Sequence, residues 1–124
     1  MAPAYRSADI VICPTLADYR SLAGFEAVNS GKPVMVSVFD GAHDELVAAT
    51  RSAISIDPLD TDRLASQLTH LVMDDEERAN LVAFARHNIP AEFGIDAAGD
   101  NVERAVSLAL DGPHRRTAAI EACR

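Results

Sequence analysis

Three short apolar runs, each separated from the next by a segment with helical spacing, most constrain how this chain can fold. They cover residues 8–13, 33–38 and 53–56. Runs this short, rich in β-branched residues and without alternating polar positions, are typical of strands buried on both faces. Strands of this kind that alternate with helices predict a parallel sheet covered by helices, which is an α/β fold.

The segments between these runs carry signals for the start and the end of helices. A helix is predicted to begin at Ser21, a good capping residue, and to end at Gly31, which Pro33 follows closely. A short helical segment is expected over residues 44–49, after the Asp40-Gly41 turn.

Three helices are predicted after the third run. The first begins at Asp60 or Thr61, the second begins with the capping-box spacing of Asp74 and Glu77, and the third covers residues 96–110. The residues expected to face the core are Leu64, Leu68, Leu71 and Val72 in the first, Leu81, Val82 and Ala85 in the second, and Val102, Ala105, Val106 and Ala109 in the third.

The number of strands limits the architecture further. A doubly wound nucleotide-binding sheet has about six strands, built as two halves of three. The sequence therefore predicts half of a Rossmann-like parallel sheet flanked by helices. Residues 1–112 are assigned to this partial domain and residues 113–124 to a tail.

Charge and apolar patterning exclude several classes of partner. Nineteen acidic residues against eleven basic ones give a net charge of -8. This sign opposes binding to nucleic acid or to anionic lipid. No apolar run approaches the roughly 20 residues of a transmembrane segment, and the first residues do not resemble a secretory signal, so a cytoplasmic location is expected.

Cys13 and Cys123 lie in no metal or disulfide motif, and Cys13 is expected to be a small buried residue.

The segment after the first strand is the place to look for a ligand site. In open parallel sheets ligands bind beyond the carboxyl ends of the strands, and phosphates favour helix N-termini. A carboxylate at Glu26 can accept two hydrogen bonds from the vicinal hydroxyls of a ribose. An acidic residue in an early helical turn is also favoured by the helix dipole without any ligand, so both interpretations stay open at this point.

Three motifs in this region resemble a known family. They are Ala8-Asp-Ile-Val-Ile-Cys-Pro-Thr, Asp18-x7-Glu26-Ala27 and Gly31-Lys-Pro-Val. Together they resemble the C-terminal donor-binding region of the family 4 (group 1) glycosyltransferases of GT-B architecture, which reads roughly Ala-Asp-x-x-x-x-Pro-Ser, Glu-x7-Glu-Ala and Gly-x-Pro-Val-Val. The resemblance extends from residue 8 to about residue 106, and trehalose-phosphate synthases share the same half-domain.

The resemblance implies roles for four residues, and Arg20, which departs from the family pattern, lies among them. Glu26 matches the glutamate that holds the ribose hydroxyls, and Asp18 matches the residue that contacts the donor sugar. The backbone N–H groups of Ser21 and Leu22 match those that bind the distal phosphate. Arg20 can contact this phosphate directly, or it can be a solvated loop arginine.

Two departures from the family pattern bear on these roles. Tyr19-Arg20-Ser21 stands where the family has Gly-Phe-Gly, so the backbone has less freedom and a cation is added. Asp18 replaces a glutamate and is shorter by one methylene.

The resemblance implies a retaining glycosyltransferase that moves a sugar from a nucleoside-diphosphate donor to an acceptor hydroxyl. The donor is a substrate, no cofactor or metal is implied, and no residue is assigned as catalytic. The acceptor domain and the cations that neutralise the leaving diphosphate are missing, so the chain by itself is expected to be inactive. Two alternatives stay open: a non-catalytic interaction module or partner subunit that pairs through its exposed sheet edge, and an α/β domain that keeps only the fold.

Overall fold

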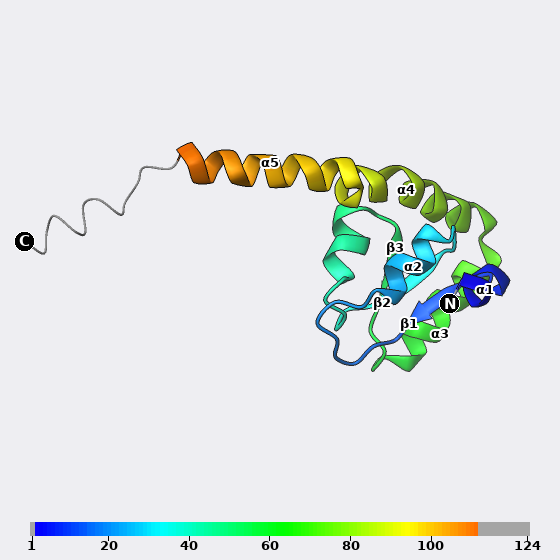
Figure 1. The fold of residues 1–124 in the computed structure, drawn as a ribbon. Helices are drawn as coiled ribbons and strands as arrows, with labels where there is room; N and C mark the ends of the chain where they lie inside the picture. Colours follow the sequence, from blue (N-terminus) through cyan, green and yellow to red (C-terminus); the bar gives the residue numbers. More distant parts are fainter. Residues whose placement is uncertain (1, 112–124) are drawn as a thin grey trace, which may run out of the picture.

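A three-stranded parallel sheet with helices on both faces forms the centre of the structure, a computed structural model that describes residues 2–111 (Figure 1). The predicted α/β fold is confirmed, and the predicted tail over residues 113–124 lies outside the described residues. The elements are α1 (Ala2–Ser7), β1 (Val11–Cys13), α2 (Ala23–Asn29), β2 (Val34–Ser37), η1 (Glu45–Ala49), β3 (Ala53–Ile56), α3 (Thr61–Met73), α4 (Asp75–Phe93) and α5 (Ile95–Asp111).

The strands follow the order β1-β2-β3, and both neighbouring pairs are parallel. Val34 of β2 pairs with Val11 of β1 on one side and with Ala53 of β3 on the other. All four residues of β2 are buried, as the continuous apolar run predicts for a central strand with both faces covered.

Each face of the sheet has its own hydrophobic core, because successive side chains of a strand point to opposite faces. Val34 and Val36 belong to the core under α2 and the later part of α4, and Met35 belongs to the core under α3 and the start of α4. The fully buried Leu46 completes the first core and Leu71 the second.

Two aspartates begin the helices of the second half as predicted. The side chain of Asp60 accepts a hydrogen bond from the Arg63 N–H at 3.0 Å, and that of Asp74 accepts one from the Glu77 N–H at 2.8 Å. Each carboxylate satisfies a backbone donor that has no partner inside its helix.

The predicted core face of α3 is correct except at its last residue. Leu71 is buried, and Leu64 and Leu68 pack against the same core. Val72 is 52% exposed, because it lies in the last turn of α3, where the chain turns into α4.

The first strand differs from its prediction. The run over residues 8–13 was expected to be buried on both faces, but β1 covers only Val11–Cys13, and of these only Cys13 is buried. Among the described residues β1 pairs with β2 alone, so it is an edge strand. Helix α1, which precedes it, was not predicted.

The connections around β2 keep the predicted order with shifted boundaries. Helix α2 begins at Ala23 rather than Ser21, although the Ser21 hydroxyl accepts the Ala23 N–H at 3.2 Å. Gly31 has a φ of 71°, a left-handed conformation that ends the helix at the predicted glycine. The segment expected to be helical over residues 44–49 is the π-helical η1, in which the Thr50 N–H donates to the Glu45 carbonyl at 3.1 Å.

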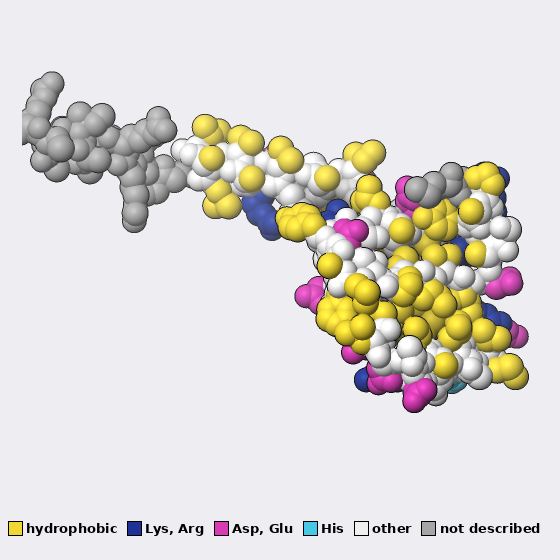
Figure 2. All heavy atoms as spheres, turned by 90° about the horizontal axis from the view of Figure 1, so that it is seen from below, with side chains coloured by type: hydrophobic (Ala, Val, Ile, Leu, Met, Phe, Trp, Pro, Cys, Tyr) yellow, Lys and Arg dark blue, Asp and Glu magenta, His cyan; other side chains and the backbone are white. Residues whose placement is uncertain are grey.

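Helix α5 (Ile95–Asp111) forms where the last helix is predicted, but its predicted core face is wrong. The side chains expected to face inward, Val102, Ala105, Val106 and Ala109, are all exposed, Val102 to 64%. The reason is that α5 leaves the body of the molecule after Gly94 and extends away from the sheet (Figure 1). Figure 2 shows hydrophobic side chains along this helix, and none of the described residues covers them.

No helix within residues 2–111 is both long enough and apolar enough to cross a membrane.

Candidate functional site

The loops that follow β1 and β2 meet at the carboxyl end of the sheet. Asp18 and Asp40 form an isolated parallel bridge, and the Gly41 N–H donates to the Asp18 carbonyl at 3.0 Å. A Cβ on Gly41 would lie 1.5 Å from the carbonyl oxygen of Tyr19, so the two loops can touch only because this residue is glycine. This is the end of a parallel sheet at which ligands bind.

Asp40 connects the two loops through its side chain. It is 4% exposed, and its Oδ1 accepts the backbone N–H groups of Ser21 at 3.2 Å and Ala42 at 2.9 Å. Its Oδ2 accepts the Thr15 hydroxyl at 3.4 Å. These bonds compensate for the burial of a carboxylate. Sequence reasoning assigned Asp40 only to a turn, because an Asp-Gly pair after a buried strand indicates a turn and nothing about its partners.

Asp18 stabilises the loop that carries the predicted phosphate contacts. Its Oδ1 accepts the backbone N–H of Arg20 at 3.0 Å, which forms an Asx turn. The side chain is exposed, and within the described residues its second oxygen has no hydrogen-bond partner. That oxygen can accept a further hydrogen bond.

The side chain of Arg20 is held against the protein. Its Nε donates to Oε2 of Glu45 at 2.8 Å, and its guanidinium carbon lies 4.8 Å from the centre of the Phe25 ring. The cation–π contact places the guanidinium against Phe25 of α2, and the ion pair adds a second, exposed contact. Arg20 is exposed, but its guanidinium has two partners within the described residues.

Ser21 and Leu22 lie immediately before α2, where the predicted phosphate contacts require them. The Ser21 N–H already donates to Asp40, and the Leu22 carbonyl accepts the Glu26 N–H at 2.9 Å. In the described part of the chain the Leu22 N–H has no acceptor. The phosphate role of both residues stays a prediction.

Glu26 is exposed on α2, and Tyr5 of α1 holds it in place. The Tyr5 hydroxyl donates to Oε2 of Glu26 at 3.0 Å. This hydrogen bond, together with partial burial and the Glu26 charge, raises the pKa of Tyr5 above its ordinary value. Tyr5 was not among the residues singled out from the sequence, since nothing in its local pattern signals a contact over 21 positions.

Cys13 lies at the end of β1, close to these loops. It is buried, as predicted, and burial followed by the charge of Asp40 raises the pKa of its thiol. A raised pKa favours the neutral thiol, which is a poor nucleophile and a poor metal ligand.

A possible group of metal ligands lies elsewhere, at the junction of α3 and α4. His70, Asp74 and Glu77 each offer a ligand atom, and these atoms lie within 4.8 Å of one another. Asp74 caps α4, and Nε2 of His70 lies 3.5 Å from Oε2 of Glu77. Oε2 of Glu77 is buried and has no hydrogen-bond partner among the described residues, and the helix cap at Asp74 accounts for only one of the three side chains.

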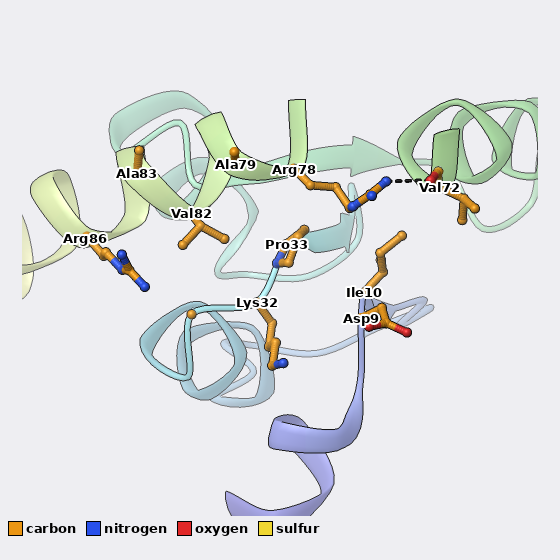
Figure 3. A pocket seen from close by; sticks show the side chains of 11 residues that line it. Asp9, Ile10, Lys32, Pro33, Val72, Arg78, Ala79, Val82, Ala83 and Arg86 are labelled. Atoms are coloured by element: carbon orange, nitrogen blue, oxygen red, sulfur yellow. Dashed lines mark hydrogen bonds between the residues drawn. The ribbon is translucent and has the colours of Figure 1, made fainter. Parts of the chain in front are cut away.

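A cavity of about 640 Å³ lies at the opposite, amino end of the sheet, beside the residues that precede β1 and β2 (Figure 3). Its charged lining residues are three cations and one carboxylate, namely Lys32, Arg78, Arg86 and Asp9, and Val82 and Pro33 belong to its apolar lining. Arg78 is held by Asp75 and by the last carbonyls of α3. None of the five predicted site residues lines this cavity, so the candidate site is the loop pair at the carboxyl end.

Comparisons with known proteins bear on this region. Residues 1–74, more than half of the chain, match the family model described as "Glycosyl transferases group 1". A solved structure of sucrose-phosphate synthase from Thermosynechococcus elongatus is similar, with a TM-score of 0.68 and 22% identity over 86% of this chain. The chain spans 27% of the length of that structure, and at this identity the likeness shows the fold alone. No curated protein matches the sequence.

Proposed function

This chain belongs to the group 1 glycosyltransferases, and we propose that it is the half-domain of such an enzyme that binds the nucleoside-diphosphate sugar donor. In the complete reaction the bond between the anomeric carbon of the sugar and the diphosphate breaks. A new bond forms from the same carbon to an acceptor hydroxyl, which loses its proton, and the configuration is retained. The nucleotide sugar is consumed as a substrate.

The meeting of two loops at the carboxyl end of the sheet is the observation that carries this proposal. The Asp18 loop and the Asp40 loop are bonded to each other through backbone and side chains. A loop that is braced in this way presents its N–H groups and side chains in a fixed arrangement, which is what binding without a large loss of conformational entropy requires.

Each predicted residue has a distinct part in donor binding. Glu26, oriented by Tyr5, accepts hydrogen bonds from the ribose hydroxyls. Arg20 and the N–H of Leu22 face the diphosphate, and the free oxygen of Asp18 accepts a hydroxyl of the sugar. The Ser21 N–H already donates to Asp40. Ser21 therefore contributes by holding the loop in place and not by donating to the phosphate.

The remaining parts of the catalytic machinery lie outside this chain in our proposal. Sugar transfer needs positive charge at the leaving diphosphate and an acceptor held beside the donor. We infer that an N-terminal acceptor domain or a partner chain supplies both, since the chain spans 27% of the similar synthase structure. The chain alone then binds the donor and does not turn it over.

A binding experiment tests the proposal without any catalytic readout. UDP, GDP and ADP are titrated separately into the ¹⁵N-labelled chain, and inorganic pyrophosphate serves as a probe that lacks ribose and base. We expect at least one nucleoside diphosphate to shift the amide resonances of residues 20–22 and of Glu26, whereas pyrophosphate shifts only residues 20–22. If none of the four compounds shifts these resonances at millimolar concentration, the donor-binding role is wrong.

The open edge of β1 favours a second candidate function, that of a non-catalytic interaction module. Among the described residues β1 pairs only with β2, so one row of its backbone groups has no strand beside it. Such edges pair readily with other chains. Size-exclusion chromatography with light scattering distinguishes the two functions when it is combined with the titration, because a compact monomer that binds a nucleoside diphosphate contradicts the interaction module.

A further inference from the structure

Two carboxylates of the chain contact the loop at which the proposed function places the donor phosphate. Arg20 Nε donates to Oε2 of Glu45 at 2.8 Å, and the Ser21 N–H donates to Oδ1 of Asp40 at 3.2 Å. Both carboxylates come from the connection between β2 and β3. The chain thus places its own anions where the proposal expects a bound one.

The two carboxylates differ in how firmly they are held. Asp40 is buried and accepts three hydrogen bonds, so it is a fixed part of the loop junction. The Glu45 side chain is 33% exposed, and among the described residues its carboxylate bonds to Arg20 alone. An ion pair this exposed is weak and is readily exchanged for another partner.

We propose that Glu45 is an internal competitor of the donor diphosphate for Arg20, and that the bound diphosphate displaces its carboxylate from the Nε–H. The inference rests on the proposed function, because it takes Arg20 as a phosphate contact.

The surroundings of Arg20 support an exchange of partners rather than a movement of the arginine. The guanidinium lies against the ring of Phe25, a contact that does not depend on Glu45. When the carboxylate leaves, Arg20 can therefore stay in place and donate the same Nε–H to a phosphate oxygen. A diphosphate carries more negative charge than one carboxylate and forms stronger charge-assisted hydrogen bonds with a guanidinium.

The substitution Glu45→Gln tests the competition, with Glu76→Gln as its matched control. Both changes remove one negative charge, but Glu76 lies exposed in the first turn of α4, outside the loop pair. Inorganic pyrophosphate is titrated into the wild-type chain and into both variants. The readouts are the dissociation constant and the chemical shifts of the Arg20 Nε–H and of the amides of residues 20–22. Thermal unfolding of each variant verifies that it is folded.

The inference predicts that Glu45→Gln binds pyrophosphate about three- to tenfold more tightly than the wild type, since one nearby repelling charge and one competing partner are gone. Glu76→Gln should bind like the wild type. Adding Arg20→Gln to Glu45→Gln should abolish the gain.

Two results would overturn the inference, and they differ in what they say about the function. If pyrophosphate shifts residues 20–22 in all variants but Glu45→Gln binds no more tightly than the wild type, Glu45 is not a competitor and the donor-binding role stands. If pyrophosphate shifts none of these residues in any variant, the phosphate site itself is wrong.

Discussion

The hydroxyl of Tyr5 lies 3.0 Å from Oε2 of Glu26 and joins α1 to α2 beside the open edge of the sheet. The bond holds Oε2 in place and so restricts the orientation of the whole carboxylate, including Oε1. A ligand that uses Glu26 therefore meets a side chain that has already lost part of its conformational freedom.

This bond makes the titration of Tyr5 dependent on Glu26. The chain has two tyrosines, so in a Tyr19→Phe background only Tyr5 is observed. The pKa of Tyr5 is raised in the folded chain, first by its hydrogen bond to Glu26. We expect Glu26→Gln to lower that pKa toward 10.0 in an absorbance titration of phenolate. An unchanged midpoint would contradict the contact.

The same shift sets the sign of a pH effect on stability. Because the folded pKa of Tyr5 lies above the unfolded value, its contribution is fully present below about pH 10 and is lost as the pH rises through the folded pKa. The free energy of unfolding of the chain should therefore fall more steeply above pH 10 than that of Tyr5→Phe.

Asp40 should be the most sensitive polar residue of the loop junction. Replacement by alanine leaves the Ser21 and Ala42 N–H groups without their acceptor, and we expect a loss of about 2–4 kcal/mol in the free energy of unfolding. Asp40→Asn keeps an acceptor oxygen and should lose less than half as much. Urea denaturation measures both, and equal losses would mean that the charge, rather than these bonds, stabilises the junction.

The substitution Gly41→Ala tests the contact between the two loops, and Gly99→Ala is its matched control. A methyl group on Gly41 collides with the Tyr19 carbonyl, whereas one on Gly99 meets nothing within 4 Å. Gly41→Ala should lower the free energy of unfolding by about 1–3 kcal/mol. Gly99→Ala, in the exposed α5, should leave it unchanged or raise it by up to about 1 kcal/mol. A mild effect at Gly41 would show that the loops are not in close contact.

Local patterns were enough to predict most of the fold. The strand over residues 53–56 and the helix starts at Asp60 and Asp74 match the structure, because a short apolar run or a capping carboxylate determines them locally. The motif from residue 18 to residue 26 likewise identified the loop and helix that form the candidate site.

Contacts between distant parts of the chain could not be predicted in this way. The bonds from Asp40 to Thr15 and Ser21 exist only because parallel pairing brings two loops to the same end of the sheet. For α5 the amphipathic pattern correctly indicated a helix with an apolar face, but it did not indicate whether a partner for Val102 and Val106 lies within residues 2–111. A sequence pattern shows that a face is apolar, and tertiary structure decides what covers it.

The most direct test of the donor-binding account compares Glu26→Gln with the wild type, using the nucleoside diphosphate that binds best and inorganic pyrophosphate. If Glu26 holds the ribose, the substitution should weaken binding of the nucleoside diphosphate by at least about tenfold, since a hydrogen bond to a charged acceptor contributes roughly 1.5–3 kcal/mol. Binding of pyrophosphate, which has no ribose, should not change. Equal affinities of both proteins for the nucleoside diphosphate would contradict the account.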